Sequence, residues 1–396
     1  MKLNLAVLFG GKSVEHEISV ITALQALKSF DQSKYNLLPI FITKNSEFYF
    51  GEALKQIENY RNLPKLLAKC RPVRLEHKGD KTYLMPSDEK VLGKVKPIAV
   101  IDVAFPIVHG TNVEDGNLQG FLHTLGLPFV GCDVFASAVC MDKFATKMIL
   151  ASTDVPVLSC LKFSNKDFEN SQSVIKKIEN KFSYPVIVKP INLGSSVGIS
   201  KVKNRNELVE AINLALQFAE FFLVETAVAN LKEINCSVLG DSEEVIASEC
   251  EEPVSSDKIL SYTDKYVTGN KTSKSAGMAS LKRKIPADIK PELRQKVQTL
   301  AKTAFQALGC TGVARLDFLY DQVSKELWLN EVNTIPGSLA FYLWEETGIK
   351  YSELLDRLIN LSLKRQRQAE LLNFSFDTNI FALGQFSAGS KSAKKI

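Results

Sequence analysis

Two pairs of polar residues stand in runs that alternate apolar and polar residues near the C-terminal end of the chain. Arg315 and Asp317 form one pair, and Glu331 and Asn333 form the other. Alternate residues of a β-strand point to the same face, so on adjacent strands these side chains can converge. Carboxylate and amide oxygens suit Mg²⁺, and a guanidinium suits a phosphoryl group or an oxyanion. The pattern predicts a phosphate and metal site; a surface salt bridge between hairpin strands is the alternative.

A lysine and a polar loop follow the end of another predicted strand. The strand spans 185–190 and contains Lys189, and the sequence GSSVG at 194–198 comes just after it. An ammonium group and the backbone N–H groups of a Gly/Ser loop can bind phosphates. The lysine precedes the loop, unlike the lysine of a Walker A motif. A glycine-rich turn with an ordinary surface lysine is the alternative interpretation.

Three further groups of polar residues stand near strand ends. Glu15 follows a Gly-Gly turn at the end of the first predicted strand, where open α/β sheets bind ligands. It could hold a substrate ammonium, or it could simply favour a helix N-terminus. The polar loop that begins at His109 is a second group. Glu225 closes an apolar strand and Glu233 follows it; they could receive ribose hydroxyls or an adenine amino group, or lie in solvent.

Composition narrows the class of protein. The chain has 396 residues, enough for two or three packed domains, and its 45% hydrophobic and 23% charged residues are ordinary for a soluble protein. A net charge of +5 is too small to indicate a nucleic-acid partner. No apolar run reaches the roughly 18–20 residues that span a bilayer, so no membrane partner is expected. The seven cysteines form no CxxC pair, which argues against disulfide and zinc frameworks and indicates a cytoplasmic protein.

The elements that must position these residues follow from periodicity. A strand at 3–9, a helix at 17–27 and strands at 36–42 and 99–105 indicate a parallel sheet with crossover helices. The segment 253–284 is polar and lacks a clear period, and we expect a lid loop there. Other expected elements are helices at 143–152, 288–308 and 351–363 and strands at 221–225, 233–239, 245–249, 313–320 and 326–331.

Taken together, seven stretches resemble the D-alanine–D-alanine ligase family of the ATP-grasp superfamily. They follow the family's order and cover nearly the whole chain except its tail, and the ordered set is far more specific than any one stretch. They are AVLFGGKSVEHEIS (6–19), VHGTNVEDGNLQG (108–120), CMDKFATK (140–147), YPVIVKPINLGSSVGIS (184–200), SYTDKY (261–266), GCTGVARLDF (309–318) and LNEVNTIPGS (329–338).

The resemblance implies an ATP-grasp fold of the α/β class, α+β in part, with an N-terminal Rossmann-like parallel-sheet domain. We expect that domain at 1–140, a central ATP-binding subdomain at 141–228, a C-terminal catalytic subdomain with the lid loop at 229–370, and a flexible tail at 371–396. It also implies a reaction. The terminal phosphoryl group of ATP would pass to the carboxylate of one D-alanine, and the amine of a second D-alanine would attack the acylphosphate. The dipeptide would serve peptidoglycan synthesis.

The resemblance also assigns roles to residues that match the family's motifs. Glu15 would hold the ammonium of the first D-alanine, and Ser195 and Tyr266 would link to Glu15 by hydrogen bonds across domains. Arg315 and the backbone N–H of Gly337 would stabilise the tetrahedral intermediate. The residues implied to contact ATP are Lys143, Lys189, Ser196, Glu225, Val228, Glu233 and Lys265, and the ligands implied for two Mg²⁺ (or Mn²⁺) ions are Asp317, Glu331 and Asn333.

The substrate side departs from the family's pattern. His109 would sit by the first substrate, but Tyr342-Leu343 occupies the place where many members have a Ser-Leu pair that meets the carboxylate of the second. Thr226 stands where many members carry a lysine near adenine. Tyr266 favours an amine as second substrate. A D-alanine–D-serine ligase, another ATP-grasp carboxylate–amine ligase and a nucleotide-binding regulatory protein are the alternatives, and the resemblance implies a homodimer.

Overall fold

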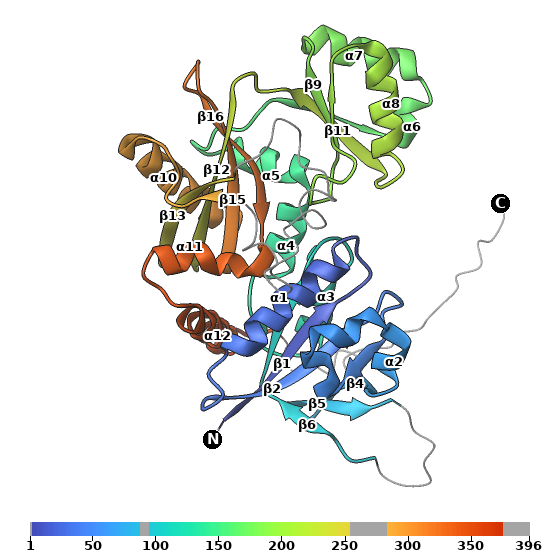
Figure 1. Cartoon of the computed structure of the whole chain (residues 1–396), viewed down its shortest axis with the longest axis vertical. Helices are drawn as coiled ribbons and strands as arrows, with labels where there is room; N and C mark the ends of the chain where they lie inside the picture. Colours follow the sequence, from blue (N-terminus) through green and yellow to red (C-terminus); the bar gives the residue numbers. More distant parts are fainter. Residues whose placement is uncertain (1, 88–94, 254–282, 375–396) are drawn as a thin grey trace, which may run out of the picture.

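The structure is a computed structural model of the 396-residue chain, and it describes residues 2–87, 95–253 and 283–374. The N-terminal part is built on a mixed sheet with strand order β6-β5-β4-β3-β2-β1-β7 (Figure 1). Strands β2, β1 and β7 are parallel, and the other neighbours are antiparallel. The strands are β1 (Leu3–Gly10), β2 (Tyr35–Ile42), β3 (Phe48–Phe50), β4 (Arg71–Lys78), β5 (Lys81–Pro86), β6 (Ala99–Ile101) and β7 (Val103–Val108).

The expected parallel arrangement therefore applies to the centre of this sheet, while its other side is antiparallel. The strand expected at 99–105 is two strands that separate at Asp102. Residues 99–101 pair with the antiparallel strand β5, whereas Val103–Val108 pairs in parallel with β1. The helices of this part are α1 (His16–Ser29), α2 (Leu63–Leu67) and α3 (Asn117–Thr124), with short 3₁₀ helices η1 (Glu52–Lys55) and η2 (Ile57–Arg61).

The central part is an antiparallel sheet with strand order β10-β9-β11-β8, covered by helices α7 and α8 (Figure 1). Apolar residues of both helices and of the strands form a separate hydrophobic cluster. Asparagine side chains cap the N-termini of both helices, Asn170 on α7 and Asn204 on α8. The elements are β8 (Cys160–Ser164), α6 (Asn165–Phe168), α7 (Ser171–Lys181), β9 (Val186–Pro190), β10 (Ser200–Val202), α8 (Arg205–Ala215) and β11 (Phe221–Thr226).

The C-terminal part is a second antiparallel sheet, with strand order β14-β13-β12-β15-β16. Helix α10 packs on β12 and β13, and the cluster beneath it also includes residues of α4 and α5. The elements are α4 (Val134–Met141), α5 (Lys143–Leu150), β12 (Leu231–Gly240), β13 (Val245–Pro253), β14 (Arg283–Lys284), α10 (Pro291–Ala307), β15 (Gly312–Asp321), β16 (Leu327–Asn333), η4 (Gly337–Ala340), α11 (Phe341–Glu346) and α12 (Tyr351–Ala369).

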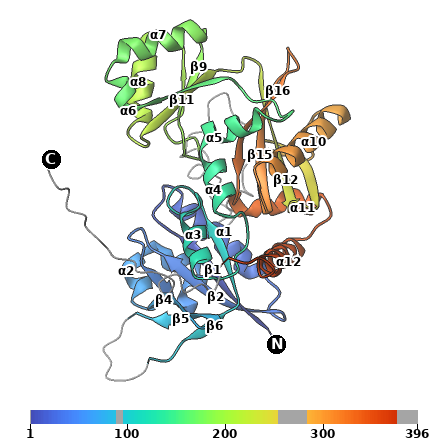
Figure 2. The ribbon, with the colours of Figure 1, turned by 180° about the vertical axis from the view of Figure 1, so that it is seen from behind.

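Helix α12 lies far from the N-terminal sheet in sequence but shares its hydrophobic cluster. Figures 1 and 2 both place α12 beside α1. Leu354, Leu355 and Leu358 of α12 are at most 1% exposed and belong to the same cluster as β1, β2 and β7. Asp356 of this helix also accepts a hydrogen bond from the Tyr35 hydroxyl at 2.8 Å. The N-terminal and C-terminal parts are thus joined by one core.

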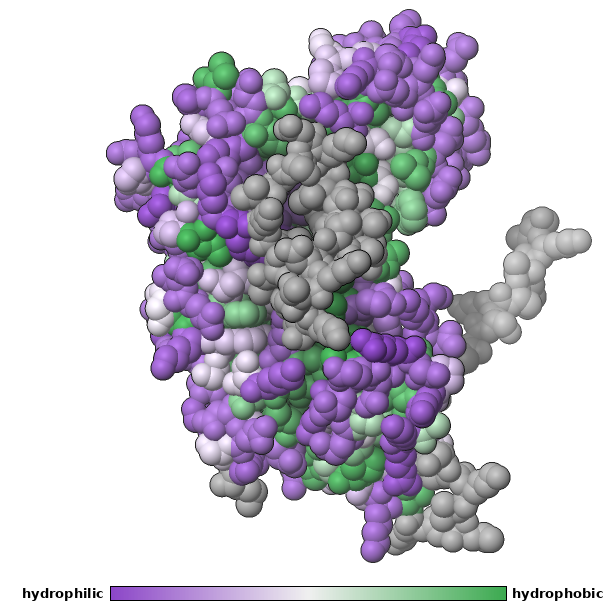
Figure 3. Space-filling model, viewed as in Figure 1, coloured by the Kyte–Doolittle hydropathy of each residue, from purple (hydrophilic) through white to green (hydrophobic). Residues whose placement is uncertain are grey.

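The expected division into domains remains a prediction. Most of the expected lid loop, together with Lys265 and Tyr266, lies outside the described residues, as does most of the expected tail. Figure 3 shows hydrophilic residues over much of one described face of the molecule. In the part of the chain that the structure describes, no helix has the length and apolar character needed to cross a membrane.

Candidate active site

Strands β15 and β16 bring the four polar residues of the first predicted site together. Arg315 lies opposite Asn333 in the strand register, and Asp317 lies opposite Glu331. The Arg315 guanidinium binds both carboxylate oxygens of Asp317 at 2.7 Å, and Asn333 Nδ2 donates to Asp317 at 3.0 Å. The two charged side chains are only 10% and 14% exposed. The arrangement is therefore a largely buried polar cluster rather than a surface salt bridge.

Oxygen donors of this cluster fit a hard cation. Asp317, Glu331 and Asn333 all line one cavity, and Mg²⁺ is usually bound by one or two carboxylates together with substrate phosphates. Among the described residues, no three His, Cys, Asp or Glu side chains are grouped closely enough to hold a metal alone. Asp317 already accepts three hydrogen bonds, and an ionised carboxylate has about four lone-pair sites. A cation here would thus depend on phosphate oxygens as further ligands.

A buried glutamate holds two lysines at the end of β11. Glu225 is 1% exposed, and its carboxylate lies 2.5 Å from Lys189 Nζ and 3.0 Å from Lys147 Nζ. Burial acts to raise the pKa of Glu225, but the two lysines outweigh it and keep that pKa below its ordinary value. Lys189 also donates to Asn330 Oδ1 at 3.1 Å, so it bridges the central and C-terminal sheets. Glu225 thus fixes a positive charge on the wall of the cavity.

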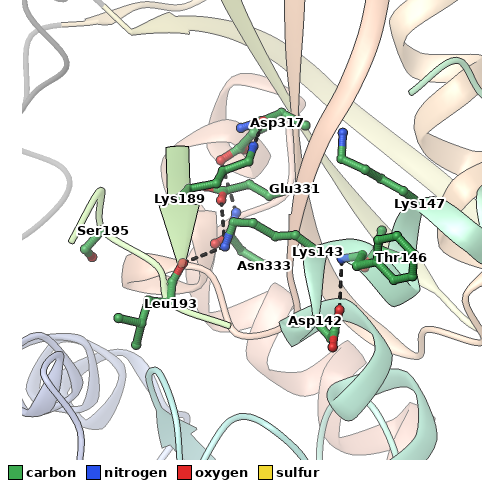
Figure 4. A network of polar contacts seen from close by, with 12 residues as sticks. Asp142, Lys143, Thr146, Lys147, Lys189, Leu193, Ser195, Asp317, Glu331 and Asn333 are labelled. Atoms are coloured by element: carbon green, nitrogen blue, oxygen red, sulfur yellow. Dashed lines mark hydrogen bonds and ion pairs between the residues drawn. The ribbon is translucent and has the colours of Figure 1, made fainter. Parts of the chain in front are cut away.

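Lys143 extends the same positive wall from helix α5. Asp142 caps this helix by accepting hydrogen bonds from the backbone N–H groups of Phe144 and Ala145, which sets the position of the adjoining lysine. Lys143 Nζ donates to the Leu193 carbonyl oxygen at 2.5 Å and lies 3.7 Å from Glu331 Oε2. Figure 4 shows Lys143 and Glu331 pointing toward one another. Burial lowers the pKa of Lys143, although Glu331 opposes the shift.

The Gly/Ser loop of the central part contacts the N-terminal part at Glu15. Ser195 Oγ donates to Glu15 Oε1. The contact needs close backbone approach, since a Cβ at Gly194 would lie 3.1 Å from Glu15 Oε2 and one at Gly110 would lie 2.9 Å from it. Ser195 itself has φ of 53°, in the left-handed region that non-glycine residues rarely adopt. Strain at this position suits a functional loop.

The loop after β7 places two buried titratable groups beside Glu15. Burial lowers the pKa of His109 to about 4, so the ring is neutral at pH 7, and its Nε2 lies 3.1 Å from Thr22 Oγ1. Burial, together with the charge of Glu15, raises the pKa of Glu114 to about 8. The Glu114 carboxyl group also accepts a hydrogen bond from the Ile335 backbone N–H at 2.9 Å. Glu114 therefore ties this loop to the segment that follows β16.

That segment turns sharply at Gly337. The next three residues, Ser338, Leu339 and Ala340, have φ of 56°, 50° and 51°. A left-handed turn of three non-glycine residues is unfavourable and persists only where the surroundings hold it. Here the Ser338 N–H donates to Thr22 Oγ1 at 3.1 Å, and all three residues are at most 2% exposed. The turn fixes Gly337 on the cavity wall.

Tyr342 and Leu343 lie behind this wall, on α11, and are 8% and 0% exposed. Neither is among the residues that line the cavity, but the Tyr342 ring packs against Arg283, which does line it. Glu114 stands in the motif at 108–120 but had no predicted role, Arg283 is a cavity residue outside the motifs, and Lys147 is a missed partner of Glu225. Lys147 had a signal, because it stands four residues after Lys143 on the same helix face.

Residues of all three parts enclose one cavity of about 500 Å³. The central part contributes Lys189 and the Gly/Ser loop, and the N-terminal part contributes its polar loops. The cavity therefore has an acidic end, a lysine-rich wall and the polar face of β15 and β16. The predicted site residues that line it are Glu15, His109, Lys143, Lys189, Ser195, Ser196, Glu225, Val228, Glu233, Arg315, Asp317, Glu331, Asn333 and Gly337.

Two family models match most of the chain. One, described as the D-ala D-ala ligase N-terminus, matches residues 4–132, and the other, described as the D-ala D-ala ligase C-terminus, matches residues 149–360. The chain belongs to the D-alanine–D-alanine ligase family. Enzymes of the D-alanine–D-alanine ligase family are ATP-dependent ligases with the ATP-grasp fold, which agrees with the expected fold class.

Relatives in the D-alanine–D-alanine ligase family align with the chain over nearly their full length. A D-alanine–D-alanine ligase from Thermosipho melanesiensis is 38% identical over 386 residues, covering 96% of this chain and 99% of the relative. The solved D-alanine–D-alanine ligase of Coxiella burnetii has a TM-score of 0.77 at 28% identity, covering 93% and 96% of the two chains. The VanG D-Ala:D-Ser ligase of Enterococcus faecalis has a TM-score of 0.75 at 31% identity, covering 91% and 100%.

Proposed function

We propose that this protein joins two D-alanine molecules in a reaction that converts ATP to ADP and phosphate. The observation that carries the proposal is the single cavity in which Glu15, Lys189 and Arg315 meet from three parts of the chain. An ammonium site, a phosphate site and an oxyanion site next to one another are the parts that an amino-acid ligase needs. The product would supply peptidoglycan synthesis in the cytoplasm. Assembly as a homodimer stays a prediction from the family.

The phosphate side is the better defined half of the proposed mechanism. ATP would lie with its adenosine near Glu225, Val228 and Glu233 and its phosphates near the lysines and Ser196. Lys143 and Lys189 neutralise phosphate charge, as phosphoryl transfer requires positioning and electrostatic stabilisation more than covalent help from the protein. Asp317, Glu331 and Asn333 would hold Mg²⁺ (or Mn²⁺), which supplies further charge neutralisation on the phosphates.

The amino-acid side follows from the acidic end of the cavity. The ammonium of the first D-alanine pairs with Glu15, which Ser195 holds in place. Its carboxylate oxygen then attacks the terminal phosphorus of ATP, the bond to ADP breaks, and an acylphosphate forms. The neutral amine of the second D-alanine attacks the carbonyl carbon, the carbon–oxygen bond to phosphate breaks, and the nitrogen releases a proton. Arg315 and the Gly337 N–H stabilise the negative oxygen of the tetrahedral intermediate.

The direct test measures ADP release with D-alanine and MgATP and identifies the dipeptide by mass, with D-serine offered as a competing second substrate. Arg315→Ala should lower kcat by about 100- to 1000-fold, the usual loss for an oxyanion-stabilising donor. Arg357→Ala is the matched control, because Arg357 forms an exposed ion pair with Glu353 within α12. Full activity of Arg315→Ala would overturn the residue assignment. ATP turnover without any D-alanyl product would overturn the substrate.

A further inference from the structure

A second arginine is built into the cavity wall by residues outside the family motifs. Arg283 begins β14 and pairs in register with Pro253 at the end of β13. Its Nη1 lies 2.9 Å from Glu251 Oε2, and its guanidinium carbon lies 3.9 Å from the centre of the Tyr342 ring. Glu251 is held in turn by Asn235, whose Nδ2 donates to Glu251 Oε1 at 3.0 Å. Arg283 and Glu251 both line the cavity.

The burial of this group argues for a role beyond bracing two strands. The Arg283 side chain is 10% exposed, and Glu251 and Tyr342 are 3% and 8% exposed. A buried ion pair of this kind contributes little net stability, because desolvation offsets most of the attraction. A guanidinium presents its N–H donors in a rigid planar fork, which suits the bidentate binding of a carboxylate. The ring of Tyr342 fixes the plane of the guanidinium, which is how a planar fork is prepared for a carboxylate.

The neighbours of Arg283 indicate which anion it binds. Lys143 and Lys189 belong to the phosphate wall, whereas Arg283 shares its neighbours with Arg315. Burial acts to lower the pKa of Arg315, but Asp317, with smaller contributions from Tyr342 and Glu251, raises it above its ordinary value. The strand register gives the same placement, because Glu251 lies opposite Asn235 and Asn235 lies opposite Asp317, so the partners of the two arginines stand in one row across the sheet. An anion bound to Arg283 would stand beside the carbonyl group that Arg315 polarises.

We propose that Arg283 binds the carboxylate of the second amino acid, with Glu251 and Tyr342 as positioning residues. The inference rests on the proposed function, since it assumes that two amino acids meet beside Arg315. It also accounts for Tyr342 at a place where many family members use a Ser-Leu pair: the tyrosine acts through Arg283 instead of touching the substrate. The acceptor would then be restricted to amines that carry a neighbouring carboxylate.

A competition between two acceptors tests the proposal. D-Alanine and D-alaninamide differ only in the carboxylate, and the dipeptide and its amide are separated by mass. The wild-type enzyme should strongly favour D-alanine. Arg283→Met should lower the ratio of dipeptide to dipeptide amide by about 10- to 100-fold, the range for a lost charged hydrogen bond. The product ratio of Arg283→Lys should lie between those of the wild type and Arg283→Met. Tyr342→Phe keeps the ring, so its product ratio should stay within about threefold of the wild-type value.

Lys232→Met is the matched control, because Lys232 of β12 pairs at 3.1 Å with Glu252 of β13, the neighbour of Glu251, but Lys232 does not line the cavity. Its product ratio should equal that of wild type. An unchanged ratio in Arg283→Met and Arg283→Lys, or an equal loss of both products, would assign Arg283 a structural role and overturn the inference. Failure of the proposed function looks different: the wild-type enzyme would then make neither product.

Discussion

Replacing Glu225 with glutamine should destabilise the protein far more than a similar change at the surface. Glu225 is 1% exposed and lies 2.5 Å from Lys189 Nζ and 3.0 Å from Lys147 Nζ. At an effective dielectric constant of about 20, unit charges at these separations attract by about 6 kcal/mol each. Desolvation of the three charges offsets most of this attraction. Removing one partner of a buried pair, however, leaves a charge uncompensated and costs about 3–5 kcal/mol.

Urea unfolding at neutral pH measures this loss, with Glu179→Gln as the matched control. Glu179 pairs with Arg205, whose side chain is 63% exposed, and such exposed pairs contribute about 0.2–1 kcal/mol. Adding Lys147→Met to Glu225→Gln should recover part of the lost free energy of unfolding, because it removes one of the two lysines left without a counter-ion. A small and equal loss in Glu225→Gln and Glu179→Gln would refute the reasoning.

Two further predictions concern the acidic end of the cavity. Ser195→Ala should raise the KM for the first D-alanine by about tenfold or more, because a hydrogen bond to a charged group contributes about 1.5–3 kcal/mol; steady-state kinetics measure it, and an unchanged KM would contradict it. Glu114 has a folded pKa of about 8, above its ordinary 4.5, so the stability that it contributes is fully present below about pH 4.5 and lost as the pH rises to about 8. This loss lowers the free energy of unfolding by about 1.4 kcal/mol per pH unit. Glu114→Gln should make the free energy of unfolding less dependent on pH, which urea unfolding from about pH 5 to pH 8 measures. The same pH dependence in the variant and the wild type would contradict the prediction.

Strand periodicity was enough to predict the convergence of Arg315, Asp317, Glu331 and Asn333. Their spacing of two residues puts each pair on one face, and a short turn joins the two strands, so local rules determine the outcome. The strand that precedes Glu15 and the strand that contains Lys189 could be located for the same reason. The helix expected at 288–308 also agrees with α10, which spans Pro291–Ala307.

Other features depend on partners distant in the sequence. Glu114 contacts Ile335, which stands 221 residues later, and Arg283 packs on Tyr342 from another element. No local pattern shows which distant residue such a side chain contacts. The split of the expected strand 99–105 into β6 and β7 has a similar cause, because β6 pairs with β5 and β7 pairs with β1. Spacing rules also cannot show that Tyr342 faces an arginine rather than the cavity.

The placement of α12 has a consequence for how the protein is made. Residues 4–132 match a family model of their own, yet their core is completed by Leu354, Leu355 and Leu358 near the other end of the chain. During synthesis, the N-terminal sheet must therefore wait for almost the whole chain to leave the ribosome before α12 can cover it. Apolar surface is exposed in the meantime, and such surface favours aggregation. The central part has its own cluster and can fold without waiting.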